Sequence, residues 1–171
     1  MPQIKIREWN EKPRTKLRFI KIGDIFCYQF SEEMFVFGQI LGKVNVGHVI
    51  QFFDIFQASP TITVEELSRA QFIGKPIIID SYTLFDRSPV WSWQIIGHQA
   101  DFDPSPFKDL AFKWGDPNGL HFGKVWLDGR REPKIFSREE VEDLDWEACV
   151  GSIVYNRILE EELASRGNKG V

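Results

Sequence analysis

The sequence predicts an α+β protein, with a strongly bent antiparallel β-sheet or partial barrel and two or three helices packed on one side. Three runs with the composition of strands, residues 24–30, 34–41 and 48–56, follow one another with short polar links. Strands connected so closely pair as antiparallel neighbours, which predicts a meander. Two Ser/Thr-x-x-Glu patterns further along the chain, at Thr63 and Ser137, are typical of helix starts.

The first predicted hairpin joins residues 24–30 to residues 34–41 through Ser31-Glu32-Glu33. Large apolar side chains recur at every second position of the first strand, as expected when one face is buried. In the second strand both faces are apolar, with Phe35 and Phe37 on one and Met34, Val36 and Ile40 on the other. We therefore expect this strand to be covered on both sides. Gly23 and Gly38 stand where a Cβ would hinder a turn or a strong bend.

The elements around this meander are predicted in chain order. A short strand at Ile4–Ile6 lies within a basic arm, residues 1–15, and a weaker strand signal covers residues 16–22. A helix follows Thr63, from Val64 to about Gln71. Further strands are predicted at residues 77–79 and 93–98.

The second half of the chain is predicted to be less regular. Residues 100–118 read as a long surface connection that ends in a turn at Asp116-Pro117-Asn118-Gly119. Residues 124–127 are extended and end at Asp128-Gly129, a possible tight hairpin turn. A helix is expected from Arg138 to about Leu144. A last helix is expected from about Trp146 or Val150 to Leu163, with Ile153, Ile158 and Leu159 toward the core.

Length and composition fit one soluble globular domain. The chain has 171 residues, of which 43% are hydrophobic and 27% charged. We expect a single domain over residues 1–171, with residues 16–130 mainly β and residues 137–163 mainly helical. No apolar run approaches the ~20 residues that span a bilayer, and the N-terminus lacks a secretory signal. With only Cys27 and Cys149 present, a structural disulfide is not expected, and the cytoplasm is the natural compartment.

Charge is distributed unevenly along the chain. The formal net charge is −4, but residues 1–22 hold seven Lys/Arg against two Asp/Glu. Residues 137–163 hold nine Asp/Glu against two Lys/Arg. This asymmetry could steer a charged partner, or it could let the two ends of the chain attract each other within the fold.

Catalytic and metal-binding patterns are largely missing from the sequence. The three histidines, His48, His98 and His121, belong to no metal-ligand motif, so neither a metal nor a cofactor is expected. His98 is expected to be half exposed and bonded to the backbone. Cys27 lies inside an apolar strand, where an inert buried thiol is expected. Asp101 and Asp103 could form a pair for acid–base work, although loop carboxylates are usually solvated or cap turns.

Nucleic-acid binding is the main alternative to a protein-binding role. The basic arm and the residues after it combine cations with aromatic rings, as single-strand binding surfaces do. The residues concerned are Lys5, Arg7, Lys12, Arg14, Lys16, Arg18 and Lys21, near Trp9 and Phe19. The acidic remainder of the chain would repel phosphate.

The acidic segment near residue 140 is the clearest candidate for a partner-binding surface. An acidic first helical turn is favoured by the helix dipole, which accounts for Glu139 and Glu140 but less well for the later acidic residues. An inhibitor of a basic protein can use such groups to speed encounter. The predicted partner-binding residues are Glu139, Glu142, Asp143, Asp145, Trp146 and Glu147.

Four short motifs occur in order along the chain: Lys21-Ile22-Gly23-Asp24-Ile25-Phe26, Phe35-Val36-Phe37-Gly38-Gln39-Ile40-Leu41, Ile50-Gln51-Phe52-Phe53 and Trp93-Gln94-Ile95-Ile96-Gly97. Together they resemble the immunity protein 26 family. That family's pattern has a Gly-Asp-x-Phe start, a strand that ends in Phe or Tyr-Gly-x-x-Leu, and a Trp-x-Ile-Ile-Gly segment downstream. The resemblance covers about residues 19–107.

The resemblance implies a bacterial cytoplasmic protein that neutralises the toxin domain of a polymorphic or contact-dependent inhibition system. Such proteins are usually encoded beside their toxin. The expected partner is a cognate toxin domain, for example a basic nuclease, bound by occlusion without catalysis; no membrane or small-molecule substrate is expected. The family has no catalytic residues to transfer, and the matching Gly23, Asp24, Gly38, Trp93 and Gly97 are expected to be structural.

Overall fold

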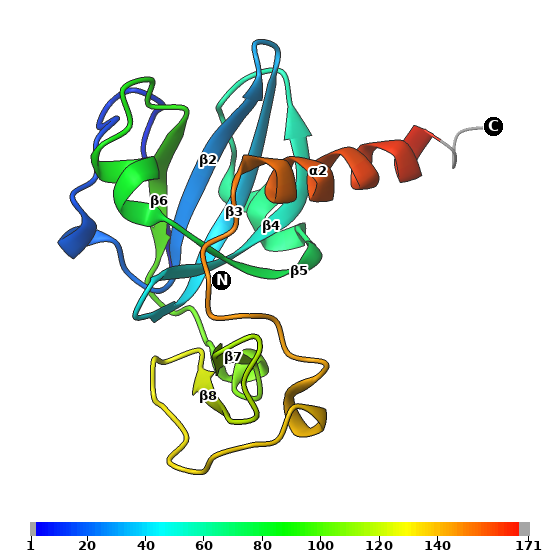
Figure 1. Ribbon diagram of the computed structural model, residues 1–171. Coiled ribbons are helices and arrows are strands. Elements are labelled where there is room, and N and C mark those ends of the chain that lie inside the picture. The colour runs from blue at the N-terminus through cyan, green and yellow to red at the C-terminus, as the bar shows by residue number, and fades with distance from the viewer. Residues whose placement is uncertain (1–2, 168–171) are drawn as a thin grey trace.

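The computed structural model describes residues 3–167 and has a six-stranded antiparallel sheet at its centre, with a small two-stranded sheet beside it (Figure 1). The order of the large sheet is β1-β6-β2-β3-β4-β5. Its strands are β1 (Ile4–Ile6), β2 (Asp24–Ser31), β3 (Met34–Val44), β4 (Gly47–Gln57), β5 (Phe72–Ile79) and β6 (Trp93–Gln99). The predicted α+β class is confirmed, and so is the β2-β3-β4 meander. The sheet is open and does not close into a barrel.

The central strand β3 is buried on both faces, as its sequence predicts. Val36 and Ile40 belong to the apolar cluster on one face, and Phe35 and Phe37 belong to the cluster on the other. The first face is covered by the helix α2 (Ser152–Gly167) and by η2 (Tyr82–Asp86), a short π-helix. The second face is covered by β1, the segment after it and α1 (Val64–Arg69). Two covered faces explain why β3 carries almost no polar residue.

The bend of the sheet comes from local irregularities. The pairing of β3 with β4 shifts register twice, and single shifts occur between β2 and β6 and between β4 and β5. Such bulges increase local twist and turn a strand. At Gly38 of β3 a Cβ would run into the ring of Phe26 on β2 and the carbonyl of Gln51 on β4. These two groups come so close to β3 only because no side chain is present at this position. Gly23 has φ +87°, which favours glycine.

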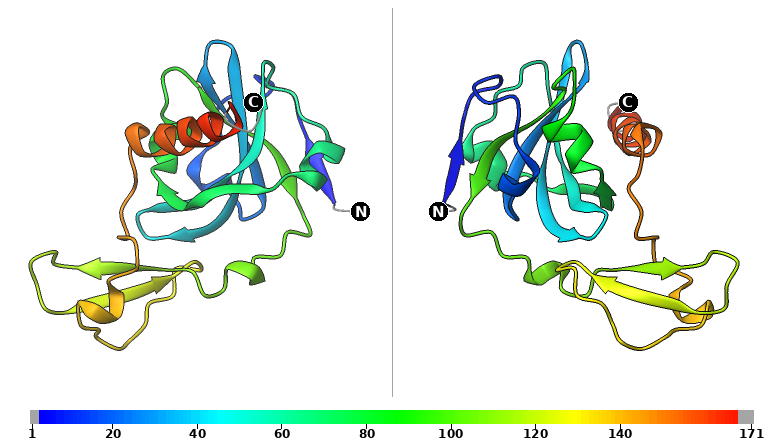
Figure 2. Two further views of the ribbon diagram at one scale, coloured as in Figure 1. Left: turned by 90° about the vertical axis from the view of Figure 1, so that its right-hand side faces the viewer. Right: turned by 60° about the vertical axis from the view of Figure 1, so that its left-hand side comes forward.

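The second sheet pairs β7 (Ala111–Gly115) with β8 (Phe122–Trp126) and forms, with the chain up to residue 147, the β7–β8 unit. Figure 2 shows this unit extending from one end of the large sheet. The predicted turn between them is present, with Gly119 N donating to the Asp116 carbonyl at 2.8 Å. The sequence did not predict β7, because its five residues fall in a stretch rich in Asp, Pro and Phe.

A third apolar cluster joins the β7–β8 unit to the sheet. Phe112, Val125 and Leu127 pack against Leu41, Val44, Val49 and Ile78 of the large sheet. The backbone contributes as well, since Lys43 N donates to the Leu127 carbonyl at 3.1 Å and, just after the unit, Val150 N donates to the Ile78 carbonyl at 2.8 Å. The unit is therefore fastened at its base.

The structure corrects the predicted elements on either side of the sheet. Residues 16–22 are no strand: they contain the 3₁₀ turn η1 (Leu17–Phe19), with Phe19 exposed and Ile20 buried. The predicted helix 138–144 is a single 3₁₀ turn, η4 (Glu139–Val141). Its capping hydrogen bonds between Ser137 and Glu140 are present. The helix stops after one turn because the chain leaves it to pair with β7.

The other two predicted helices, α1 and α2, are both present, but their ends differ from the predicted ones. The capping box of α1 is formed between Thr63 and Glu66, and the helix ends at Arg69. Helix α2 begins at Ser152 and buries Tyr155 and Leu159. The expectation that Ile153 faces the core is wrong, because its exposed fraction is 83%. Residues two apart on a helix point about 200° away from each other, so Ile153 cannot share the face of Tyr155.

Prediction on packing at Gly38: the substitution Gly38→Ala should lower the free energy of unfolding by about 2 kcal/mol, because its methyl group would overlap Phe26 and the Gln51 carbonyl. Urea denaturation measures the change. Gly151→Ala is the matched control, since nothing lies within 4 Å of a Cβ placed there. A Gly38→Ala protein as stable as the Gly151→Ala protein would contradict the close approach.

Prediction on His48: stability should fall as the pH falls below neutrality, because burial lowers the pKa of this imidazole to about 4 from an ordinary 6.5. The side chain is 1% exposed and its Nδ1 lies 2.9 Å from the Ser81 hydroxyl. Between these two pKa values the unfolded chain binds more protons than the folded one. His48 should therefore remove about 2 kcal/mol between pH 7 and pH 5.

The measurement is urea denaturation at both pH values for the wild type, His48→Gln and His121→Gln. His121 is exposed and serves as the control. The pH dependence should be flatter in His48→Gln alone; an unchanged pH dependence in that variant would refute the assignment.

Candidate functional site

The predicted acidic segment lies along the edge of β7. Lys113 N donates to the Asp145 carbonyl at 2.8 Å, and Glu147 N donates to the Lys113 carbonyl at 2.7 Å. Trp146 and Lys113 thereby form a parallel bridge outside the two-stranded sheet. Residues 145–147 are thus held in an extended conformation that the sequence did not predict.

Three of the predicted partner-binding residues have structural contacts. The Asp145 carboxylate pairs with Lys75 Nζ of β5 at 2.6 Å. The Glu147 carboxylate pairs with Arg131 at 2.8 Å and its side chain is only 4% exposed. The Trp146 ring lies 6.0 Å from the Phe122 ring and under Lys113 Nζ. These contacts position the segment: the Glu147 side chain is shielded, whereas the Asp145 side chain and Trp146 remain exposed.

The other three predicted residues, Glu139, Glu142 and Asp143, are exposed. None of their side chains forms an ion pair within residues 3–167. They are free to meet a partner. Sequence reasoning missed the apolar side chains of the same unit: Trp114, Leu120 and Ile135 are 40%, 78% and 64% exposed. No periodicity separates these residues from core positions, so the sequence carried no signal for them.

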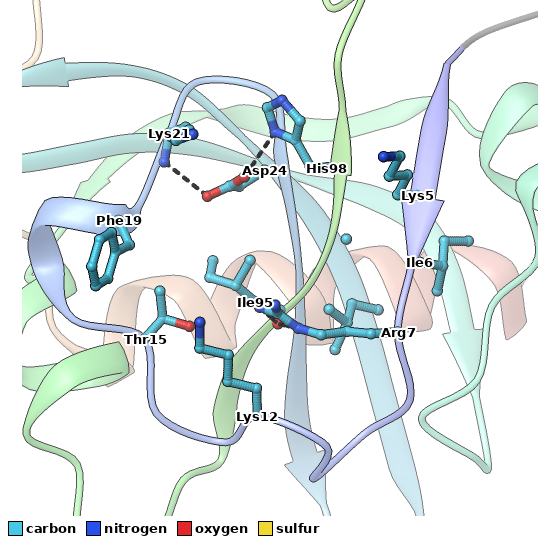
Figure 3. Close-up of a pocket in the computed structure, with 12 residues that line it drawn as sticks. Lys5, Ile6, Arg7, Lys12, Thr15, Phe19, Lys21, Asp24, Ile95 and His98 are labelled. Atoms are coloured by element: carbon cyan, nitrogen blue, oxygen red, sulfur yellow. Dashed lines mark hydrogen bonds and ion pairs between the residues drawn. The ribbon is translucent and has the colours of Figure 1, made fainter.

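A separate, concave site lies on the N-terminal side of the molecule and is called here the arm pocket (Figure 3). Its volume is about 300 Å³, and it is bordered by β1, by the arm and the segment up to Lys21, and by β6. Its cationic residues are Lys5, Arg7, Lys12 and Lys21. Figure 3 shows Lys5 and Arg7 on one side of the pocket and Lys12, Thr15 and Lys21 on the other.

Asp24 and His98 form the polar end of the arm pocket. One carboxylate oxygen of Asp24 lies 2.8 Å from His98 Nδ1, and the other accepts from Lys21 N at 2.8 Å. Asp24 is buried, and burial raises its pKa above the ordinary value, against the opposing effect of these hydrogen bonds. Both oxygens are therefore engaged in holding the β2 start, the Lys21 backbone and β6 together.

The pocket corrects two sequence expectations. His98 is half exposed as predicted, but its partner is the Asp24 carboxylate and not the backbone. The arm does not pair with the acidic C-terminal region in the part of the chain that the structure describes. Its ion pair is Arg14 with Asp86, at 2.7 Å, and Arg7 donates to the Ile95 carbonyl. Residues 1 and 2 of the predicted arm lie outside the described residues.

The remaining chemical candidates have structural explanations. Asp101 accepts from Gln3 N at 2.9 Å and so connects the loop after β6 to the residue before β1, whereas Asp103 accepts from the backbone and hydroxyl of Ser105 and caps a local turn. Cys27 is buried, and burial raises the pKa of its thiol. Across residues 3–167, no three His, Cys, Asp or Glu side chains are placed to share a metal ion.

Comparison with known proteins assigns the family. The family model for immunity protein 26 matches residues 21–121, which is 101 of the 171 residues. The chain belongs to the immunity protein 26 family. Neither a curated protein nor a solved structure matches it. Within the described residues, no helix is both long and apolar enough to cross a membrane.

The span shared with immunity protein 26 runs from the start of β2 through β7. It includes Asp24 and His98 but neither the basic arm nor the acidic segment. Residues that match the family pattern are structural here. Trp93 is 1% exposed in the core, and a Cβ on Gly97 would meet the Lys5 carbonyl of β1. Each candidate surface, the arm pocket and the acidic segment on β7, is therefore built partly from residues inside the family match and partly from residues outside it.

Prediction on the acidic segment: Glu147→Gln should lower the free energy of unfolding by about 1–2 kcal/mol, because it removes the charge that pairs with Arg131 at a shielded position. Glu142→Gln should change it by less than about 0.5 kcal/mol, as expected for an exposed residue. Thermal and urea unfolding measure both. Equal effects of the two substitutions would contradict the different placements of these carboxylates.

Proposed function

We propose that this protein neutralises a cognate bacterial toxin domain by binding it and covering its working surface, without turning over a substrate. Membership of the immunity protein 26 family is the observation that carries the proposal. In this proposal the protein acts in the bacterial cytoplasm, in a polymorphic toxin or contact-dependent inhibition system. A basic nuclease is the kind of toxin that its acidic surface suits.

The β7–β8 unit is the part of the molecule that we propose as the toxin-binding surface. Its base is packed against the sheet, while Trp114, Leu120, Ile135 and Trp146 remain exposed. Exposed aromatic and aliphatic side chains on a rigid support are the anchors that dominate protein interfaces. A support fastened by a buried cluster loses little conformational freedom on binding, which favours affinity.

Acidic groups next to these anchors supply the electrostatic part of the proposal. Glu139, Glu142 and Asp143 are exposed and have no ion pairs among the described residues. Long-range attraction between such a rim and a basic partner speeds encounter, while buried apolar contacts determine how slowly the complex dissociates. Asp145 and Glu147 are assigned a supporting role, because their charges are already paired within the chain.

Prediction on association: the triple variant Glu139→Lys, Glu142→Lys, Asp143→Lys should bind a basic toxin domain with an association rate about tenfold lower at low salt, with a smaller change in dissociation. Stopped-flow or surface-based kinetics at two salt concentrations measure this. The matched control is Glu32→Lys, Glu33→Lys, Glu160→Lys, which changes the net charge equally at exposed positions outside the unit. Equal slowing by both variants would remove the acidic rim from the interface.

The proposed function itself is tested in cells. The toxin domain encoded beside this gene is expressed with and without the protein, and growth and co-purification are measured. We expect rescue of growth and a stable complex, both lost when Trp114 and Leu120 are replaced by Asp. Catalytic turnover by the purified protein, abolished by a single side-chain replacement, would overturn the proposal.

A further inference from the structure

We propose that the arm pocket binds a compact phosphate-bearing small molecule. Lys5, Lys12 and Lys21 border it, and none of them forms an ion pair within residues 3–167. Arg7 adds a fourth cation, and Asp24 is the one carboxylate among the lining residues. Four cations gathered in a concave site with a single carboxylate attract an anion, because the walls exclude part of the screening solvent.

Thr15 supplies an independent observation at the same site. The residue is only 4% exposed, and its hydroxyl oxygen is shielded from solvent. This oxygen nevertheless has no hydrogen-bond partner among the described residues. Buried hydroxyls are nearly always paired, since leaving one unpaired is unfavourable. Thr15 lines the pocket, and Figure 3 shows its oxygen directed toward Lys12. A ligand oxygen that enters between these two side chains would pair the hydroxyl.

The rest of the pocket is built to hold these donors in place. Arg7 is fixed to β6 by donating to the Ile95 carbonyl. The Lys21 backbone is fixed by Asp24, whose second oxygen is held by His98. Both Asp24 oxygens are therefore engaged before an anion arrives, so this carboxylate orients the site and does not occupy it. Lys12 is exposed, and its flexible side chain can move to admit a ligand.

The arrangement fits a phosphate group better than a planar carboxylate. Donors come from both sides of the pocket, from Lys5 and Arg7 on one and from Lys12, Thr15 and Lys21 on the other, which suits a tetrahedral anion (Figure 3). A volume of about 300 Å³ admits a small molecule but not a folded partner. The apolar walls at Ile6, Phe19 and Ile95 leave room for an uncharged remainder such as an ester group.

This inference is independent of the toxin-binding proposal, since the arm pocket and the β7–β8 unit share no residue. The experiment uses the full chain and titrates inorganic phosphate and glycerol 3-phosphate by calorimetry, with the melting temperature as a second readout. We expect saturable binding and a melting temperature that rises with ligand. Thr15→Val should weaken the affinity about tenfold, because it removes a hydrogen bond to a charged group. Thr15→Ser, which retains the hydroxyl, should bind phosphate with an affinity close to that of the wild type.

The variants also separate binding from structure. Without phosphate, Thr15→Val should melt at the wild-type temperature or above, since the lost hydroxyl had no partner. Lys12→Met and Lys21→Met should each weaken phosphate binding severalfold. Lys16→Met is the matched control, because Lys16 is an exposed lysine of the same segment that does not line the pocket.

Three results would overturn the inference. The first is no saturable binding of either phosphate compound. The second is an affinity that falls as much in Lys16→Met as in Lys12→Met, which would indicate general attraction of anions to the segment. The third is preferential binding of a single-stranded oligonucleotide that depends equally on all these lysines, which would favour a nucleic-acid surface.

Discussion

The aromatic cluster around Trp93 is the interaction on which the rest of the fold depends. Its indole lies 4.4 Å from the Tyr28 ring, measured between centroids, and between 5.2 and 5.9 Å from four other aromatic rings. These five neighbours come from β2, β4, η2 and α2. One buried side chain of β6 thus connects three strands to both helical elements on that face. Aromatic contacts of this kind stabilise beyond the area that they bury.

The position of β6 has consequences for the arm pocket. Trp93 fixes one end of the strand in the core, while His98 at the other end meets Asp24 and β1 pairs along its edge. Lys5 of β1 and the adjacent Arg7 are therefore brought opposite Lys12 and Lys21 by the same strand that anchors the core. A pocket built this way is preorganised, and a ligand would gain contacts without ordering much of the chain.

The β7–β8 unit shows a different relation between packing and exposure. Its inner side chains complete a cluster with β3, β4 and β5, and its outer side chains remain uncovered. The acidic segment is bound to its edge through Lys113 and Arg131, and to β5 of the large sheet through Lys75. A small platform with apolar side chains and an acidic rim is consistent with binding a protein. Its first strand lies inside the span shared with the family, and its second strand and acidic rim follow that span.

The sequence by itself determined the meander, the two capping boxes, the double burial of β3 and the family, because these depend on local periodicity, turn residues and short motifs. Tertiary structure decided what depends on residues far apart in the chain. Pairing with β7 ended the predicted helix after Val141, and packing of Tyr155 and Leu159 against the sheet left Ile153 on the exposed face of α2. Of six predicted partner-binding residues, ion pairing took Asp145 and Glu147 into the framework. The fold of the arm against β6 also decided that the Thr15 hydroxyl is unpaired. Whether a polar group is satisfied depends on its surroundings and not on its residue type.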